Sequence, residues 1–117
     1  MAVANKPLIW LPFAAGGMLA ALLLPALILV LMLGSSGLLG SGALAHARVH
    51  DFVAHPLVAI ALFSVLALVL WHVAHRLRMT VQDLGVRRHG PRRVLAWCCY
   101  LLASAGTVAL AAALVLL

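Results

Sequence analysis

Hydrophobic residues fall into three long runs along this chain, at residues 12–33, 57–76 and 94–117. The first run holds no charged residue, and the second is interrupted only by Ser64 and His72 until its last two positions. Each run reaches the length of about 20 residues that crosses a bilayer as a helix. Because a backbone in lipid must make its hydrogen bonds within its own segment, we predict an all-α integral membrane protein with three transmembrane helices.

Composition restricts the class of protein further. Hydrophobic residues make up 67% of the 117 residues and charged residues only 9%, whereas soluble domains use about 45–50% apolar residues. A soluble enzyme is therefore excluded. The length leaves room for three crossings and little else, so we predict a single membrane domain over residues 1–117.

Positive charge gathers on one side of this predicted topology. The segment before the first run and the segment after the second run share a side, and together they hold Lys6, Arg76, Arg78, Arg87, Arg88, Arg92 and Arg93. The other connection holds only Arg48. Because basic residues favour the cytoplasmic side, we predict a cytoplasmic N-terminus and a periplasmic C-terminus. The basic side indicates contact with membrane lipid or an acidic protein partner, and not with nucleic acid.

The connection between the first two runs predicts a loop followed by a short helix. Its first half is rich in Gly and Ser, and residues 43–54 have the pattern of a short surface helix. His46 and His50 lie one turn apart in that helix, at a spacing that metal ligands use. Only Asp51 or His55 would be near enough to add a third ligand, so we expect no metal site.

Two features of the first run predict local geometry. Pro25 lies near its middle and removes a backbone hydrogen bond, which predicts a kink. Gly16 and Gly17 lie nearer its start, and residues without a side chain allow another helix or a flat ligand to approach the backbone closely.

Polar side chains interrupt the end of the second run. Helical spacing puts Trp71, His75 and Arg78 on one face, and His72 with Arg76 on the adjoining face. Interfacial anchoring explains Trp71, Arg78 and the later arginines. It explains His75 and Arg76 less well, because an ionisable group this close to the apolar body is costly unless it pairs or has a function.

Trp10 and Phe13 lie at the same predicted membrane depth as these groups. An indole N–H, an imidazole and a guanidinium would then converge beside an aromatic ring at the cytoplasmic interface. Such a pocket suits a flat, lipid-soluble molecule with two carbonyl oxygens.

Several short strings, in a fixed order and spacing, span nearly the whole chain. They are Pro7-x-x-Trp10-x-x-Phe13-x-Ala15-Gly16-Gly17-Met18, then Pro25, then Trp71-x-x-x-His75-Arg76, Asp83-Leu84 and Trp97-x-x-Tyr100. Together they resemble the D subunit of bacterial fumarate reductase, a small three-helix membrane anchor.

The resemblance implies a multi-pass membrane-anchor subunit in the bacterial cytoplasmic (inner) membrane that is not catalytic by itself. Its partners would be a second membrane anchor (the C subunit), an iron–sulfur subunit and a flavoprotein subunit. Menaquinol, or another quinol, would be oxidised near the iron–sulfur subunit, and electrons would pass to FAD for the reduction of fumarate in anaerobic respiration. The quinone would be shared with the partner subunits, and no cofactor would be bound covalently.

By the same resemblance, the quinone-binding residues are Trp10, Phe13, His75 and Arg76. We expect Arg76 and the Trp10 indole to donate hydrogen bonds to the quinone oxygens and to stabilise negative charge that develops there. We expect His75 to accept or relay a proton.

Two alternatives stay open. A succinate dehydrogenase-type anchor would bind haem b through a histidine within a span, for which His72 is the candidate, although we do not expect haem here. A non-catalytic helical adaptor would use its arginines only to dock a partner or anionic lipid. The direction of turnover and the identity of the quinone are not encoded in this chain.

Overall fold

The computed structural model describes residues 6–85 and 88–117 and is all-helical over them. Its elements are α1 (Lys6–Ser35), α2 (His46–Ala54), α3 (Pro56–Asp83) and α4 (His89–Val115). The helices α1, α3 and α4 are each long and apolar enough to cross a membrane. The predicted all-α architecture with three candidate spans is therefore confirmed.

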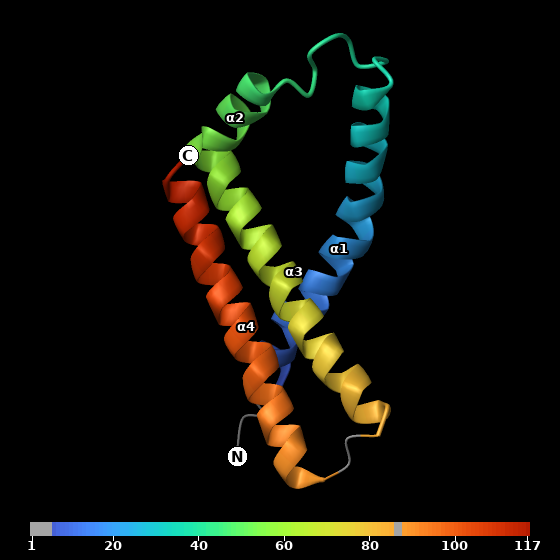
Figure 1. Ribbon diagram of the computed structural model, residues 1–117, viewed down its shortest axis with the longest axis vertical. Coiled ribbons are helices and arrows are strands. Elements are labelled where there is room, and N and C mark those ends of the chain that lie inside the picture. Colours follow the sequence, from blue (N-terminus) through green and yellow to red (C-terminus); the bar gives the residue numbers. More distant parts are fainter. Residues whose placement is uncertain (1–5, 86–87) are drawn as a thin grey trace.

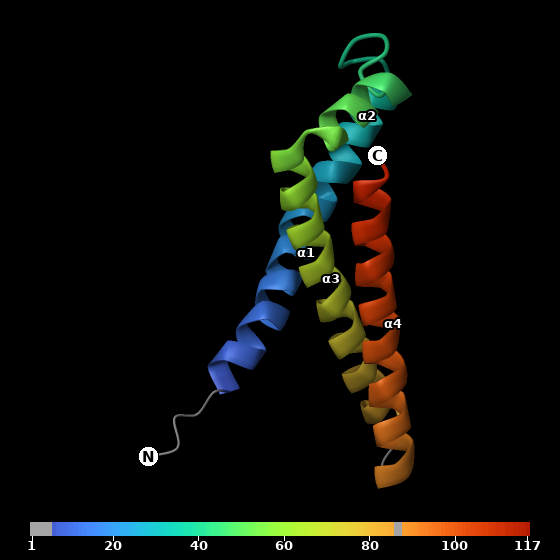
Figure 2. The same cartoon turned by 90° about the vertical axis from the view of Figure 1, so that its left-hand side faces the viewer.

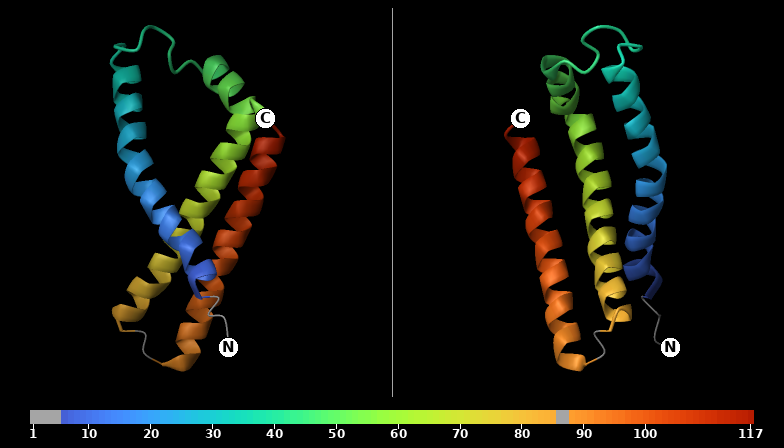
Figure 3. Two further views of the ribbon diagram at one scale, coloured as in Figure 1. Left: turned by 180° about the vertical axis from the view of Figure 1, so that it is seen from behind. Right: turned by 45° about the vertical axis from the view of Figure 1, so that its right-hand side comes forward.

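The three long helices lie side by side with α3 in the middle, as Figure 1 and the right-hand view of Figure 3 show. α4 packs beside α3 and runs in the opposite direction. α1 crosses α3 near its own N-terminal half and diverges from it toward α2. Figure 2 shows that α1 runs at a clear angle to the pair formed by α3 and α4.

One end of the molecule holds the beginning of α1, the end of α3 and the beginning of α4, and the other end holds α2 and the end of α4 (Figure 1). The predicted basic segments therefore lie at the same end. Arg87, one of the arginines in that prediction, lies outside the described residues. Which end faces the cytoplasm stays a prediction from the positive-inside rule.

Both α3 and α4 extend past the predicted spans at this basic end. α3 continues to Asp83 and α4 already begins at His89, whereas the sequence prediction followed only the apolar stretch. A helix does not have to end where the hydrocarbon ends, because its backbone hydrogen bonds are internal at any depth.

α1 is a single helix that contains Pro12 and Pro25. It bends in its middle part, as Figures 1 and 3 show, and Pro25 lies ten residues before its end. A proline inside a helix removes one backbone donor and its ring displaces the preceding turn, which accounts for the bend.

Two serine hydroxyls inside the spans are satisfied by their own helices. Ser64 donates to the Ile60 carbonyl and Ser104 to the Tyr100 carbonyl, each at 2.8 Å. These bonds to the preceding turn remove the cost of a free hydroxyl in an apolar medium.

The connection from α1 to α2 contains the predicted glycine-rich loop. Gly37, Gly40 and Gly42 have φ values of 79°, 92° and 80°, a left-handed conformation that a side chain disfavours. The predicted surface helix is present as α2. Pro56 at the first turn of α3 then begins the next helix directly after His55, as proline at this position favours.

Few side chains are buried within the chain. Ala74 of α3 meets Cys99 and Ala103 of α4 in a small core, against which Leu70 and Leu95 pack. Most large aliphatic side chains of the spans point outward, as expected where lipid or another apolar surface is the surrounding medium.

The divergence of α1 from α3 leaves a groove of about 400 Å³ between them. Its walls are entirely aliphatic and include Leu23 and Leu27 of α1 and Leu62 and Val69 of α3. The groove lies on the α2 side of the α1–α3 crossing, and it is therefore separate from the polar residues at the basic end.

Candidate functional site

The crossing of α1 and α3 is built around two glycines and a histidine. A Cβ atom at Gly16 would overlap the Leu68 carbonyl oxygen, and one at Gly17 would overlap the ring of His72. The two helices thus approach so closely because neither glycine has a side chain. His72 Nδ1 is hydrogen-bonded to the Phe13 carbonyl oxygen at 2.5 Å, so that it must be the protonated nitrogen in this contact.

This contact holds Phe13 against the next turn of α3. The Phe13 ring stacks on the His75 imidazole, with ring centroids 4.6 Å apart and an interplanar angle of 28°. Phe13 therefore meets α3 twice, through its carbonyl and through its ring. The predicted association of Phe13 with His75 is present in the structure.

His75 is held on its other side by α4. Its Nδ1 lies 3.1 Å from the Tyr100 hydroxyl oxygen, and Arg78 Nη1 donates to the same oxygen at 3.0 Å. The Arg78 guanidinium carbon also lies 5.6 Å from the centre of the Tyr100 ring, within the range of a cation–π contact. The hydroxyl of Tyr100 is thus the meeting point of two α3 side chains.

Trp71 completes this face of α3. Its ring stacks on Tyr100 at a centroid separation of 5.8 Å, and its Nε1–H donates to Thr107 Oγ1 at 3.3 Å. Thr107 Oγ1 in turn donates to the Ala103 carbonyl at 2.8 Å. The predicted shared face of Trp71, His75 and Arg78 is therefore the face that meets Tyr100.

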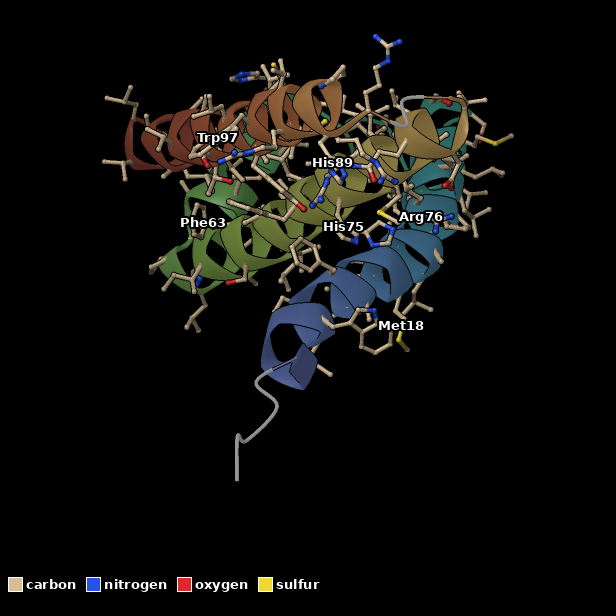
Figure 4. All side chains as sticks on the ribbon, turned by 90° about the horizontal axis from the view of Figure 1, so that it is seen from below. Met18, Phe63, His75, Arg76, His89 and Trp97 are labelled. Carbon is tan, nitrogen blue, oxygen red and sulfur yellow. The ribbon has the colours of Figure 1, made fainter. Side chains whose placement is uncertain are left out.

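Two of the four predicted quinone-binding residues lie on the outside of the chain. Trp10 is 66% exposed, and Arg76 is exposed as well. Figure 4 views the molecule from the basic end and shows Arg76 close to His75 on α3, while Trp97 lies away from them on α4. The described residues thus bring Phe13 and His75 into contact and leave the Trp10 indole and the Arg76 guanidinium open to the surroundings.

Two donors near this cluster have no acceptor among the described residues. They are Nε of Arg78 and Nε2 of Gln82, a side chain that is only 8% exposed. Both residues lie on α3, beyond His75 toward the basic end. The polar face that begins at Trp71 therefore continues through the last turns of this helix.

His72 lies at the crossing of α1 and α3. The sequence named it only as the candidate ligand of the haem alternative, and its ring lies half-buried against Gly17, with Nδ1 bonded to the α1 backbone. Because Nδ1 is used in this bond, Nε2 would have to be the iron ligand in the haem alternative. A histidine opposite a Gly-Gly pair is the sequence signal for such a contact.

Tyr100 was not predicted as part of the site. It is the only tyrosine of the chain and lies within an apolar run, where a phenolic hydroxyl requires a hydrogen-bond partner. That requirement is the signal that points from Tyr100 to the polar groups of α3.

The histidines of α2 lie at the opposite end of the molecule. The rings of His46 and His50 stack at 6.0 Å, and His50 Nδ1 lies 3.7 Å from a carboxylate oxygen of Asp51. Over residues 6–85 and 88–117, no group of three or more His, Cys, Asp or Glu side chains is placed to hold a metal ion.

So small a core beneath an outward apolar surface is typical of a polytopic membrane subunit that belongs to a larger assembly. Comparison with known proteins identifies the family to which this chain belongs. Residues 1–116 match the family model of the fumarate reductase D subunit, and the chain belongs to this family. The resemblance drawn from the sequence strings is confirmed, and family membership makes the chain a membrane subunit of a fumarate reductase.

Individual relatives agree with the family model. The fumarate reductase D subunit of Mycobacterium tuberculosis (strain H37Rv) is 36% identical over 103 residues, which cover 87% of this chain and 80% of the relative. The protein of the same name from Photobacterium profundum is 38% identical over 81 residues, or 68% of each chain. That of Vibrio cholerae serotype O1 is 35% identical over 81 residues, or 68% of this chain and 62% of the relative.

Proposed function

We propose that this chain is the membrane anchor of a quinol:fumarate reductase and that it supplies one wall of the site at which menaquinol is oxidised. In this role it holds the iron–sulfur and flavoprotein subunits at the cytoplasmic face of the bacterial inner membrane, beside a second membrane anchor. The observation that carries the proposal is the Phe13–His75 pair at the α1–α3 crossing, with the Arg76 guanidinium beside it and open.

The chemistry of these residues fits a quinone head group. Trp10 and Arg76 provide N–H donors, His75 provides an imidazole and Phe13 provides an aromatic surface, and two carbonyl oxygens on a flat ring need this set of groups. Menaquinol, when bound, supplies two electrons and two protons. Because Trp10 and Arg76 are exposed on this chain, the remaining walls would come from the partner subunits.

Each residue would have a separate task. Arg76, a permanent cation with several donors, would bind one quinone oxygen and stabilise negative charge on it. The Trp10 indole would donate to an oxygen as a neutral group. Phe13 would cover the imidazole of His75 and exclude water from that side. His75 would bind an oxygen and hold a proton next to it.

Replacement of Arg76 tests the proposal most directly. In membranes that contain the assembled complex, Arg76→Ala should lower menaquinol-dependent fumarate reduction by about tenfold or more, since a hydrogen bond to a charged group contributes about 1.5–3 kcal/mol. Fumarate reduction from a soluble artificial donor should be unchanged, because that donor delivers electrons without this site. Arg92→Ala removes another exposed arginine at the same end and should leave both rates unchanged.

Trp10 has a matched control on another helix. Trp97 of α4 is 65% exposed, nearly the same as Trp10. Trp10→Leu should reduce quinol-dependent turnover several-fold, and Trp97→Leu should not. If Arg76→Ala and His75→Ala complexes assemble normally and keep full quinol turnover, the assignment of the site is wrong.

The absorbance spectrum of the gently solubilised complex separates the alternatives. Flavin and iron–sulfur absorbance copurifying with the chain supports the anchor role. A colourless preparation would favour a non-catalytic adaptor, and a Soret band that is lost in His72→Phe would favour a haem-bearing anchor.

A further inference from the structure

The hydroxyl of Tyr100 binds two α3 side chains that the sequence-based pocket did not connect. Arg78 Nη1 lies 3.0 Å from it and His75 Nδ1 lies 3.1 Å from it. Only His75 among these three residues belongs to the predicted quinone site. The arrangement therefore joins that site to α4, which contributes none of the four predicted quinone-binding residues.

The direction of the two hydrogen bonds follows from the donors available. A guanidinium has N–H donors and no acceptor, so the Tyr100 oxygen accepts from Arg78. The single hydroxyl proton of Tyr100 then needs an acceptor, because an unpaired hydroxyl in an apolar environment is costly. Among the described residues, the acceptor within hydrogen-bond distance is His75 Nδ1.

A neutral imidazole carries one proton. If Nδ1 accepts from Tyr100, that proton is on Nε2. The opposite assignment, in which Nδ1–H donates to Tyr100, would direct both Arg78 and His75 donors at one oxygen and would leave the hydroxyl proton without a partner among the described residues. The first assignment gives the Tyr100 hydroxyl and His75 Nδ1 a partner each.

We propose that Tyr100, itself held by Arg78, is a positioning residue that fixes His75 as the Nε2-protonated tautomer, so that His75 offers a quinone oxygen a hydrogen-bond donor. This inference rests on the proposed quinol site and adds the role of two residues to it. It also changes the role of His75, from the group expected from the sequence to accept or relay a proton to a donor that orients the quinone head.

The hydrogen-bond partners of the Tyr100 hydroxyl also limit proton movement through it. A proton that reached the phenol could not continue to Arg78, because Arg78 has no acceptor atom. Among the described residues, Tyr100 therefore orients His75 and passes no proton on to Arg78. The Phe13 ring, stacked on the His75 imidazole, restricts the tilt of the imidazole plane. The bond to Tyr100 restricts a flip of the imidazole, which would move Nδ1 to the other edge.

Tyr100→Phe removes the hydroxyl and keeps the ring that stacks on Trp71. With the histidines of the assembled complex labelled with ¹⁵N, and the His75 signals assigned by comparison with His75→Gln, wild type should show the Nε2-protonated form. In Tyr100→Phe the signal should move to a mixture of both tautomers. The KM for menaquinol should rise about three- to tenfold, as expected for one misplaced hydrogen bond, with a smaller change in kcat and no change with an artificial donor.

Two further variants keep the test decisive. Arg78→Met keeps a long side chain but frees the Tyr100 oxygen to accept from Nδ1, so it should also produce mixed tautomers. Thr107→Val removes the hydroxyl that accepts from Trp71 in the same α3–α4 contact and should change neither the His75 signals nor the KM. A Thr107→Val effect equal to that of Tyr100→Phe would mean that Tyr100 has only a structural role.

The outcomes separate this inference from the proposed function. Wild-type His75 protonated at Nδ1, or His75 signals unchanged in both Tyr100→Phe and Arg78→Met, overturns the positioning role even if His75→Ala and Arg76→Ala abolish quinol turnover. Full quinol turnover in those last two variants overturns the proposed site, whatever tautomer His75 has.

Discussion

α3 contacts its two neighbours by different means. Against α1 the contact uses the α1 backbone, because Gly16 lies directly on the Leu68 carbonyl and Gly17 on the His72 ring. Against α4 the contact is between side chains, where Ala74 packs in the small core and Tyr100 binds polar groups of α3. Without a hydrophobic driving force between helices in lipid, close backbone packing and interhelical hydrogen bonds are the two available sources of stability. The α1–α3 crossing combines close packing at two glycines with the His72–Phe13 bond, and the α3–α4 interface combines a core of small residues with the bonds to Tyr100.

The two interfaces also differ in what they leave open. Beyond the crossing, α1 departs from α3 and leaves the aliphatic groove of about 400 Å³. α4 stays beside α3, so that Leu70 reaches Gly106 and Trp71 reaches Thr107. The orientation of α1 is thus determined by a short segment, and that segment also carries Phe13. Changes at the crossing should therefore disturb both the fold and the candidate site.

Adding one methyl group at the crossing should have the largest effect. In Gly16→Ala the new Cβ would overlap the Leu68 carbonyl oxygen and lie 2.8 Å from His72 Cβ, and a backbone atom cannot move aside without moving its helix. We expect a loss of about 3 kcal/mol, at the upper end of overpacking effects. Denaturation of the chain by SDS in mixed micelles measures it, together with the yield of assembled complex.

Two other glycines serve as controls for the loss of stability expected in Gly16→Ala. In Gly106→Ala the new Cβ would lie 2.8 Å from Leu70 Cδ2, the end of a flexible side chain, so the expected loss is below about 1 kcal/mol. A Cβ added at Gly90 would have nothing within 4 Å of it among the described residues, and Gly90→Ala should be neutral or stabilising by up to about 1 kcal/mol. Equal stability of the Gly16 and Gly90 variants would disprove the backbone contact.

Overpacking of the α3–α4 core should have an intermediate effect. Cys99 is buried against Ala74 and Ala103, whereas the adjacent Cys98 is exposed. Cys99→Leu should therefore destabilise the chain by about 2 kcal/mol, and Cys98→Leu by much less. The same SDS titration compares the two variants. A larger loss for Cys98→Leu would mean that α4 is rotated about its axis relative to the structure.

Loss of the hydrogen bond at the crossing should have the smallest effect. His72→Phe keeps a ring against Gly17 but removes the bond to the Phe13 carbonyl, which should cost about 1 kcal/mol. Quinol turnover should fall as well, because Phe13 would no longer be held against His75. Val73→Phe places a ring at the exposed neighbouring position and is the control. Unchanged stability and turnover in His72→Phe would show that this bond does not orient Phe13.

The sequence predicted some of the side-chain arrangement near the crossing. Helical periodicity grouped Trp71, His75 and Arg78 on one face, and all three contact Tyr100. Equal membrane depth suggested that Phe13 would be near His75, and their rings stack. These predictions succeeded because they depend on the geometry of single helices and on the depth of each residue.

Other parts of the site could not be read from the sequence. Equal depth did not determine which side of its helix each residue faces, and the Trp10 indole points outward from this chain. The partner of His72 and the convergence on Tyr100 depend on the rotation of each helix about its own axis. A helix that is apolar on all sides is equally stable in lipid at many rotations about its axis, so hydrophobic periodicity does not select one rotation.

By itself, the sequence determined that this protein has three long apolar helices with most of its basic residues at one end. Each helix satisfies its own backbone in lipid, and the length of each apolar run sets the number of crossings. Only the tertiary structure decided that the Phe13 carbonyl binds His72 and that Tyr100 binds both His75 and Arg78. The physical reason is that contacts between membrane helices come from close packing at a few small residues and from paired polar groups. Such contacts exist only once the crossing angle and the rotation of each helix are fixed.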